Sequence, residues 1–240
     1  MVAAVTGALP AAAIPATPAA ECRARSADTV APLIELYTSE GCSSCPPADR
    51  WISSFKAQRD VVALAFHVNY WDHLGWRDRF GSAAFAERQA RQQRVNGARY
   101  SYTPQVVIDG RDRPDWPRAR GAARPTADVA LTMQRDGARV LAHVEALAGA
   151  PAQLSGYWAV TEDDHESAVR AGENAGETLR HDFVVREHRP IAAWNARPGE
   201  PLRLEFTPAT PADPKHPQRI ALVVTATAGK PLQALQLGPC

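Results

Sequence analysis

The chain has no excess of charge of either sign. Its 27 Lys and Arg residues against 26 Asp and Glu residues give a formal net charge of +1 at pH 7. This balance provides no electrostatic basis for binding nucleic acid or an anionic membrane surface, and neither is expected as a partner. No apolar run is long enough to span a bilayer, so the mature chain is not expected to insert into a membrane.

Motifs of several large enzyme classes are also missing. The sequence contains neither a glycine-rich phosphate-binding loop nor a serine nucleophile elbow. It has a single C-x-x-C pair, Cys42 and Cys45, and no second pair that would complete a compact zinc site. The four cysteines, an even number, fit an oxidising compartment instead.

The first 20 residues carry no charge and are rich in alanine and proline. They resemble the apolar region and small-residue cleavage zone of a secretory signal, although the basic start of such a signal is absent. We therefore expect a signal-like or leader segment at 1–20 and a periplasmic or secreted protein.

The candidate reactive site is the C-x-x-C pair. A strand-like apolar run at 33–37 leads into Cys42 and Cys45, and residues 48–58 then have apolar side chains at helical spacing. The free N–H groups and the dipole at a helix start favour a thiolate. That effect is worth about 0.3–1 kcal/mol, so alone it lowers a thiol pKa by less than one unit. Redox chemistry, a structural disulfide and half of a zinc site are all compatible with the motif.

Further elements are predicted on both sides of an Arg- and Pro-rich segment at 111–125. Before it, we expect a buried strand at 61–68, a helix from Ser82 to about 96–97, and a strand after Pro104. After it, evenly spaced apolar runs with turn-prone separators predict an antiparallel sandwich or barrel. These runs are 129–135, 138–147, 153–161, 178–187, 202–207 and 219–225.

The order strand, C-x-x-C, helix, strand, helix, Thr103-Pro104, strand resembles the thioredoxin fold. More closely, the chain is similar to a family of bacterial secreted proteins catalogued as domain of unknown function 1223. The similarity runs from about 33 to 224. It rests on Glu-Leu-Tyr-Thr-Ser-Glu-Gly-Cys-Ser-Ser-Cys-Pro-Pro-Ala-Asp at 35–49, the aromatic loop Tyr-Trp-Asp-His-Leu-Gly-Trp at 70–76, Tyr-Thr-Pro-Gln-Val-Val at 102–107, and Gly-Glu-Asn at 172–174.

The fold class implied by the resemblance is an α/β thioredoxin-like domain followed by an antiparallel β-rich, sandwich-like domain. The expected organisation is the signal-like segment (1–20), an N-terminal arm (21–32), the thioredoxin-like domain (33–117), a linker (118–128) and the β-rich domain (129–240).

The resemblance also implies roles for several residues. Cys42 and Cys45 would form a disulfide, with Cys42 as the exposed nucleophile and Cys45 as the resolving cysteine. The Thr103–Pro104 bond would be cis and lie against this disulfide. Thioredoxins carry a buried acid six residues before the first cysteine. Here that position is Leu36, and Glu35 would point to the other face of the strand, which makes a proton-shuttling role for Glu35 doubtful.

Two histidines are candidates on their own chemistry. His67, near the end of a buried strand, and His73, in the loop that follows, could stabilise a thiolate or move a proton. Together with Cys42 and Cys45 they could formally supply four zinc ligands. A helix and a buried strand separate the cysteines from the histidines, however, so we expect no metal site.

Two further features concern partners and the chain ends. Tyr70, Trp71 and Trp76 could line a groove for a peptide partner or could cap the core. Cys22 and Cys240 lie outside any motif and close to the two chain ends, which are often near each other in a compact protein. We therefore expect a second disulfide between them.

The function expected from these observations is thiol–disulfide oxidoreduction on protein thiols or disulfides, without a cofactor. Two alternatives remain. One is a non-catalytic binding module, in which the β-rich part recognises a partner and the disulfide is permanent. The other is a metal-handling protein.

Overall fold

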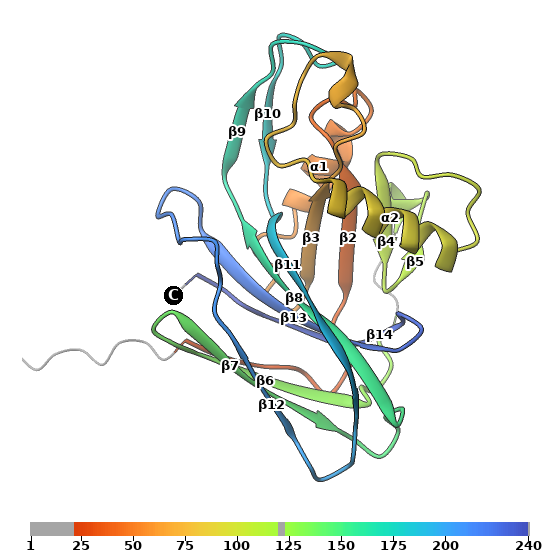
Figure 1. Cartoon of the computed structure of the whole chain (residues 1–240), viewed down its shortest axis with the longest axis vertical. Helices are drawn as coiled ribbons and strands as arrows, with labels where there is room; N and C mark the ends of the chain where they lie inside the picture. The colour runs from red at the N-terminus through yellow and green to blue at the C-terminus, as the bar shows by residue number, and fades with distance from the viewer. Residues whose placement is uncertain (1–21, 120–122, 240) are drawn as a thin grey trace, which may run out of the picture.

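The computed structural model describes residues 22–119 and 123–239 (Figure 1). Most of its regular structure is β-strand, and the described residues contain two α-helices. In chain order the elements are β1 (Arg23–Arg25), β2 (Leu33–Thr38), α1 (Pro46–Ser53), β3 (Val62–His67), α2 (Ala83–Val95), β4 (Gln105–Ile108), β5 (Arg111–Asp112), β6 (Val129–Asp136), β7 (Arg139–Ala146), β8 (Gln153–Glu162), β9 (His165–Ala168), β10 (Thr178–His181), β11 (Val184–Asn195), β12 (Leu202–Phe206), β13 (Gln218–Ala226) and β14 (Pro231–Leu237).

A sheet of eight strands, in the order β14-β13-β8-β11-β3-β2-β4-β5, takes strands from both halves of the chain. β3 pairs in parallel with both β2 and β11, and the other neighbouring strands are antiparallel. Every residue of β2 and β3 is buried, as expected for central strands covered on both faces.

The two helices lie on opposite faces of this sheet. Alternate residues of β2 point to opposite sides: Ile34 and Leu36 pack with residues of α1, whereas Leu33 and Tyr37 pack on the side that holds Phe85 of α2. α2 begins directly after Ser82, close to the predicted start, and the Ser82 hydroxyl caps it by accepting a hydrogen bond from the Ala84 N–H. The α1 face of the sheet is the side that carries the C-x-x-C turn.

A second sheet of four strands, in the order β1-β6-β7-β12, packs against part of the first one. Its inward residues form a core cluster with apolar residues of β8, β13 and β14. Trp158 of β8 and Phe206 of β12 stack across this interface with ring centroids 5.0 Å apart. This part of the molecule has two face-to-face sheets, as in a sandwich.

The expected fold class is wrong, because the α/β thioredoxin-like domain and the separate β-rich domain do not exist as two successive bodies. The twelve-residue strand β11 pairs with β8 along one side and with β3 on the other, and so joins the two regions into one sheet. Local apolar patterns predict where strands form but not which distant strands pair. The expected boundaries, with a linker at 118–128, concern independent folding and stay a prediction.

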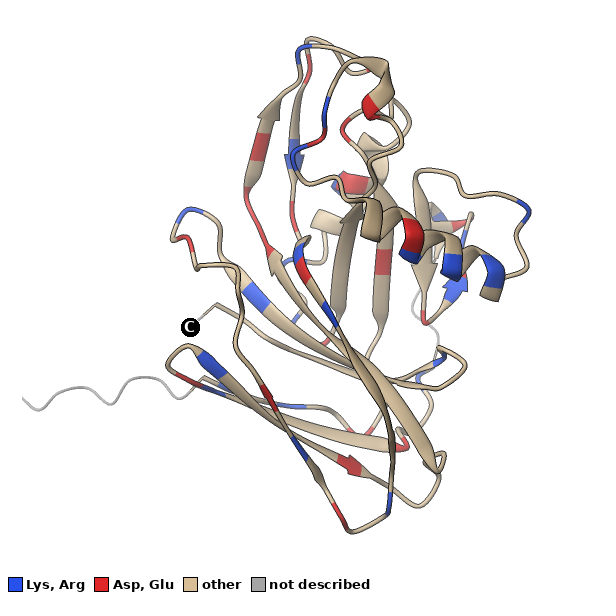
Figure 2. Ribbon diagram, in the orientation of Figure 1, with Lys and Arg blue, Asp and Glu red and all other residues tan. Residues whose placement is uncertain are grey.

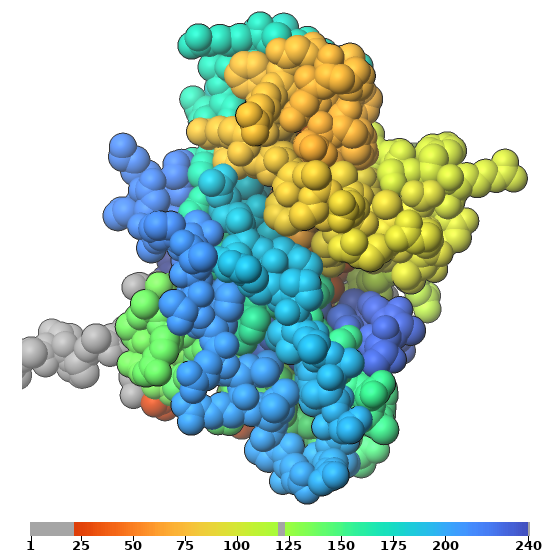
Figure 3. Space-filling model, in the orientation of Figure 1, coloured from red at the N-terminus to blue at the C-terminus, as the bar shows by residue number. Residues whose placement is uncertain are grey.

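A β-hairpin formed by β9 and β10 extends the β8–β11 pair beyond the sheet (Figure 1). β10 lies against α1, and the hairpin stands beside the aromatic loop that follows β3 (Figure 3). Residues 169–177, which connect the two strands, are called the hairpin tip below. The hairpin brings residues from late in the sequence to the start of α1.

Lys and Arg residues are interspersed with Asp and Glu residues over the ribbon (Figure 2). Within the described ranges, none of the helices is both long enough and apolar enough to cross a membrane. The signal-like segment at 1–20 and Cys240, the expected partner of Cys22, lie outside the described residues, so these two expectations stay predictions.

Candidate functional site

The C-x-x-C pair closes the turn that leads into α1. Cys42 and Cys45 form a disulfide, with their Cα atoms 5.4 Å apart. Cys45 directly precedes the helix, and Pro46 and Pro47 occupy its first two positions. Proline has no N–H group, and the next two N–H groups of the helix bond to the Cys45 carbonyl. The helix start therefore offers fewer free donors to a Cys42 thiolate than the motif predicts.

Both cysteines are buried. Cys42 is 1% exposed and Cys45 is 0% exposed, so the structure does not show the exposed Cys42 that the motif predicts. The two residues between them, Ser43 and Ser44, are exposed. The Ser44 Oγ lies 3.4 Å from the Cys42 Sγ. After reduction, this hydroxyl is placed to donate a hydrogen bond to a thiolate.

The Thr103–Pro104 peptide bond is cis, which confirms this prediction. The Ser44 hydroxyl donates to the Thr103 carbonyl at 3.4 Å, and the Trp71 Nε1–H donates to the Thr103 hydroxyl at 2.8 Å. Trp71 also packs on Gly41, where an added Cβ would lie 2.8 Å from the Trp71 Cβ. The fold thus brings Trp71 and Thr103 to the C-x-x-C turn.

His67 is fully buried on the α1 face of the sheet. Its Nδ1 lies 2.7 Å from the Asp78 Oδ2, and Asp78 also accepts hydrogen bonds from the N–H groups of Glu40 and Phe80. Burial favours neutral His67, but the adjacent Asp78 outweighs it and raises the pKa of His67. Burial likewise opposes the charge of Asp78, yet His67 and the two N–H donors lower the pKa of Asp78 to about 2. Each member of the pair thus favours the charged form of the other.

Three more buried ionisable residues, which the sequence did not single out, extend this pair toward α1. His181 of β10 has its Nε2 3.4 Å from the Glu40 Oε1 and its Nδ1 4.0 Å from the Asp49 Oδ2. The His67 and His181 rings meet edge to face at 4.9 Å. Burial raises the pKa of Asp49, which lies one helical turn after Cys45 on the same buried side of α1. A buried network of acids and imidazoles thus lies beside the disulfide.

The hairpin tip completes the surroundings of the C-x-x-C turn. The Glu173 Oε2 accepts hydrogen bonds from the Ser43 N–H at 2.9 Å and the Ser43 hydroxyl at 2.8 Å. The Asn174 Nδ2 donates to the carbonyls of Glu40 and Cys42, at 2.8 and 3.0 Å. Only the Gly-Glu-Asn motif at 172–174 marked these residues in the sequence, and it did not indicate that they contact the cysteines.

Residues 33–225 match the family model described as protein of unknown function, DUF1223. The chain belongs to the DUF1223 family. The match includes the C-x-x-C turn, the cis-proline strand and the hairpin tip.

Two solved structures are similar to this DUF1223 chain. A crystal structure of a protein from Agrobacterium tumefaciens superposes with a TM-score of 0.65 at 22% identity, covering 90% of this chain and 97% of that chain. HBP35 of Porphyromonas gingivalis gives a TM-score of 0.61 at 14% identity, covering 89% of this chain and 76% of that chain. At these identities the similarity shows the fold alone. No curated protein sequence matches the chain.

Glu35 of this DUF1223 chain points away from the disulfide, as the offset from Leu36 predicts. It lies on the α2 side, where it forms an ion pair with Arg88 and accepts a hydrogen bond from the Tyr157 hydroxyl at 2.6 Å. The Arg88 guanidinium also donates to the Tyr37 hydroxyl. Glu35 is therefore a structural residue that ties α2 to the sheet.

The side chains considered as zinc ligands do not come together. His67 is bonded to Asp78, whereas His73 is exposed and its Nδ1 lies 2.7 Å from the Tyr70 carbonyl. Among the described residues, no group of three or more His, Cys, Asp or Glu side chains is arranged to hold a metal ion.

Proposed function

We propose that Cys42 and Cys45 exchange disulfides with thiols or disulfides of partner proteins. The observation that carries this proposal is the size of the loop that the bond closes, because the two cysteines are only three residues apart. The chain-entropy model gives such a small loop about 2 kcal/mol, against about 3 kcal/mol for a fifteen-residue loop. A bond at this position is thus a weak staple, which favours a reactive role.

The proposed reaction needs only the Cys42–Cys45 pair and a disulfide or dithiol of the partner. The Cys42 thiolate attacks a sulfur of a partner disulfide, and the other partner sulfur leaves as a thiolate. Cys45, deprotonated, then attacks the Cys42 sulfur, which re-forms the Cys42–Cys45 bond and releases the second partner sulfur. Two electrons pass to the partner in this direction, and the same steps in reverse oxidise a partner dithiol.

A permanent disulfide in a binding module is the second candidate, and the burial of both cysteines favours it. The reduction potential separates the two functions. We expect the Cys42–Cys45 potential to lie above roughly −300 mV, within reach of cellular thiol couples, whereas a structural bond lies below that value. Titration of the purified protein in glutathione buffers, with Cys22 and Cys240 replaced by serine, measures this potential. A value below the limit would reject exchange chemistry.

We also propose that the protein acts in the periplasm or outside the cell. A disulfide-bonded pair and the signal-like start of the chain both support an oxidising compartment. Fractionation of cells that express the full chain tests this location. Recovery of the protein in the cytosolic fraction, with the pair reduced, would contradict it.

A further inference from the structure

Exchange at Cys42 requires a second sulfur to reach the Cys42 Sγ, but the described structure leaves Cys42 only 1% exposed. Thiol–disulfide exchange proceeds by direct attack of one sulfur on another, and its rate depends on access. If the proposed function holds, some part of the structure that covers the disulfide has to move.

The hairpin tip is the cover whose contacts reach the C-x-x-C turn from a distant part of the chain. The Glu173 carboxylate accepts hydrogen bonds from the N–H and the hydroxyl of Ser43. The Asn174 amide donates to the carbonyls of Glu40 and Cys42. The tip also meets the aromatic loop, since an added Cβ at Gly172 would lie 3.4 Å from the Trp76 Cβ. These contacts fasten the tip on the side of the turn where Ser43 is exposed.

The strands of the hairpin contribute only one buried aliphatic side chain, and Phe80 packs against the rings of His165 and His181. The buried residues of its strands alternate with exposed ones and are His165, Ser167, Leu179 and His181. None of the four belongs to the three hydrophobic clusters of the described structure. A pocket of about 150 Å³ is lined by residues of β10 and of the first turns of α1, which are otherwise in contact. Segments with few apolar contacts open at lower free energy than the core.

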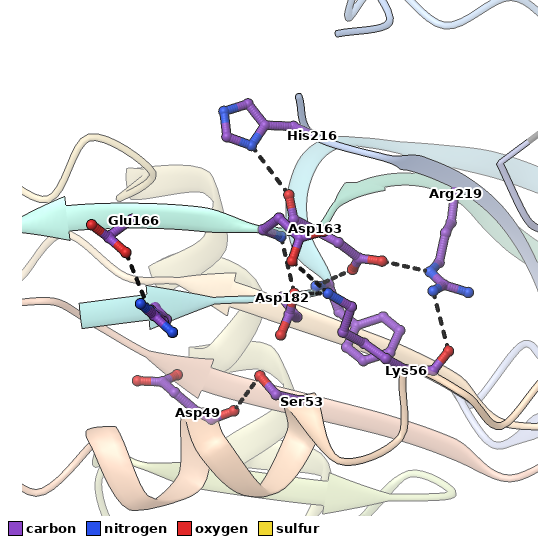
Figure 4. A network of polar contacts seen from close by, with 11 residues as sticks. Asp49, Ser53, Lys56, Asp163, Glu166, Asp182, His216 and Arg219 are labelled. Carbon is purple, nitrogen blue, oxygen red and sulfur yellow. Dashed lines mark hydrogen bonds and ion pairs between the residues drawn. The ribbon is translucent and has the colours of Figure 1, made fainter. Parts of the chain in front are cut away.

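The base of the hairpin, in contrast, is firmly attached (Figure 4). Lys56, just after α1, pairs with Asp164 at 2.6 Å and with Asp182 at 2.8 Å. Arg219 of β13 pairs with Asp163 at 3.0 Å. Asp163 and Asp164 at the start of the hairpin, and Asp182 at its end, therefore anchor it to the rest of the molecule.

Both strands of the hairpin also change direction at its base. Asp164 and Phe183 have φ angles of 60° and 56°, which L-residues other than Asn and Asp rarely adopt. The Asp163 side chain accepts a hydrogen bond from the Phe183 N–H at 2.9 Å, and the Asp182 side chain accepts one from the Asp164 N–H at 3.0 Å. Both strands of the hairpin thus bend where they leave the sheet, and the part beyond the bend has few apolar contacts.

We propose that the β9–β10 hairpin is a lid over the Cys42–Cys45 disulfide, with Glu173 as its latch on Ser43. The lid pivots at the bend between 163–164 and 182–183 while Lys56 and Arg219 hold its base. A partner reaches Cys42 only when Glu173 has left the Ser43 donors.

The test compares Glu173→Ala with Glu177→Ala. Glu177 lies on the same hairpin and carries the same charge, but its side chain makes no hydrogen bond or ion pair with any described residue. The rate of reduction of the disulfide is measured with excess dithiothreitol, which is uncharged, and with excess glutathione, which is anionic. Loss of the latch should accelerate both reactions by the same factor, about three- to tenfold, and Glu177→Ala should leave both unchanged.

Three results would overturn the lid. They are an unchanged rate in Glu173→Ala, an acceleration confined to glutathione, which would indicate a charge effect, and an equal acceleration by Glu177→Ala. Amide hydrogen exchange of residues 165–181, corrected for intrinsic rates, should rise in Glu173→Ala by a similar factor. The reduction potential is measured separately, so a potential below roughly −300 mV would reject the exchange function while leaving the result on the lid intact.

Discussion

At the scale of single residues, this protein holds its layers together with buried charges that are paired across elements. Glu35 of β2 and Arg88 of α2 are 3% and 13% exposed at the side chain, and they form an ion pair on the α2 face of the sheet. The Arg88 guanidinium also lies 4.3 Å from the Phe66 ring centroid. Removing one member of such a pair leaves the other charge buried and uncompensated.

Glu35→Gln is therefore predicted to lower the free energy of unfolding by about 3–5 kcal/mol. Gln can still accept the hydrogen bond from the Tyr157 hydroxyl. The loss of stability therefore reports the missing negative charge beside Arg88. Urea denaturation followed by far-UV circular dichroism measures the change. The double variant Glu35→Gln/Arg88→Met removes both charges and should recover at least half of the loss. Equal stabilities of the single and double variants would show that the charge pairing is not the cause.

His165 predicts a dependence of stability on pH. Burial lowers the pKa of His165 to about 3, with further contributions from His216, stacked on it at 3.8 Å, and from Arg186. The other ionisable groups that face its ring are Glu162, whose Oε2 lies 2.9 Å from the Nε2, and Arg79 and His181. In the unfolded chain the imidazole has its ordinary pKa near 6.5. The stabilisation by neutral His165 is thus complete above pH 6.5 and is lost as the pH falls toward 3.

We expect the His165 contribution to fall by about 1.4 kcal/mol per pH unit between pH 6 and pH 4. The free energy of unfolding of the wild type and of His165→Gln is compared across this range. Gln retains an N–H group for Glu162 but takes up no proton. The unfolding free energy of the variant should therefore depend less steeply on pH, by the contribution of one proton. Parallel slopes in the two proteins would contradict the assignment.

The residues of the candidate site divide into those that sequence patterns could find and those that they could not. Cys42 and Cys45 belong to a local motif, and Thr103 and Pro104 were identified by resemblance. Glu173 contacts Ser43 across 130 residues of sequence. No local spacing records such a contact, because it depends on the path of the hairpin through space.

At the scale of elements, local patterns located most strands well but failed where tertiary contacts set the backbone. The predicted run at 178–187 is two strands, β10 and β11, separated by Phe183 with its positive φ. Phenylalanine is common in strands, so residue 183 itself gives no sign of such a bend. The Asp163 side chain stabilises the bend by accepting a hydrogen bond from the Phe183 N–H. Helix α2 was predicted closely, and its last residue, Val95, is 63% exposed.

The bend itself can be tested at Asp164, whose side chain is 55% exposed and whose φ is 60°. Asp164→Gly and Asp164→Ala both remove the ion pair with Lys56, but only Ala keeps a Cβ, which is unfavourable in the left-handed region. Ala should be less stable than Gly by about 1 kcal/mol. Urea denaturation of both variants decides the point. If Ala equals or exceeds Gly in stability, the conformation at 164 is not a constraint on the ribbon.

At the scale of the whole molecule, the two halves of the chain share both a sheet and a core. Leu33, Tyr37 and Phe66 from the first half pack in one cluster with Tyr157 and Val223 from the second. The Ala65 N–H donates to the Phe183 carbonyl at 2.8 Å, where β3 meets β11. The proline- and arginine-rich segment suggested a domain border because its composition is that of a linker. Composition says nothing about strand pairing across it.

This shared core predicts one cooperative unfolding transition for the entire chain. Separation of the halves would expose the edge of β3 that pairs with β11 and the apolar side chains of the shared cluster. A fragment of residues 33–117 should therefore not fold alone. Urea unfolding is followed by tryptophan fluorescence and by far-UV circular dichroism, and the two curves should coincide with a single midpoint. The fragment, expressed separately, should lack a cooperative transition. Two resolved transitions in the whole chain, or a fragment that melts cooperatively, would establish two independent domains and would show that β11 joins bodies that are stable without it.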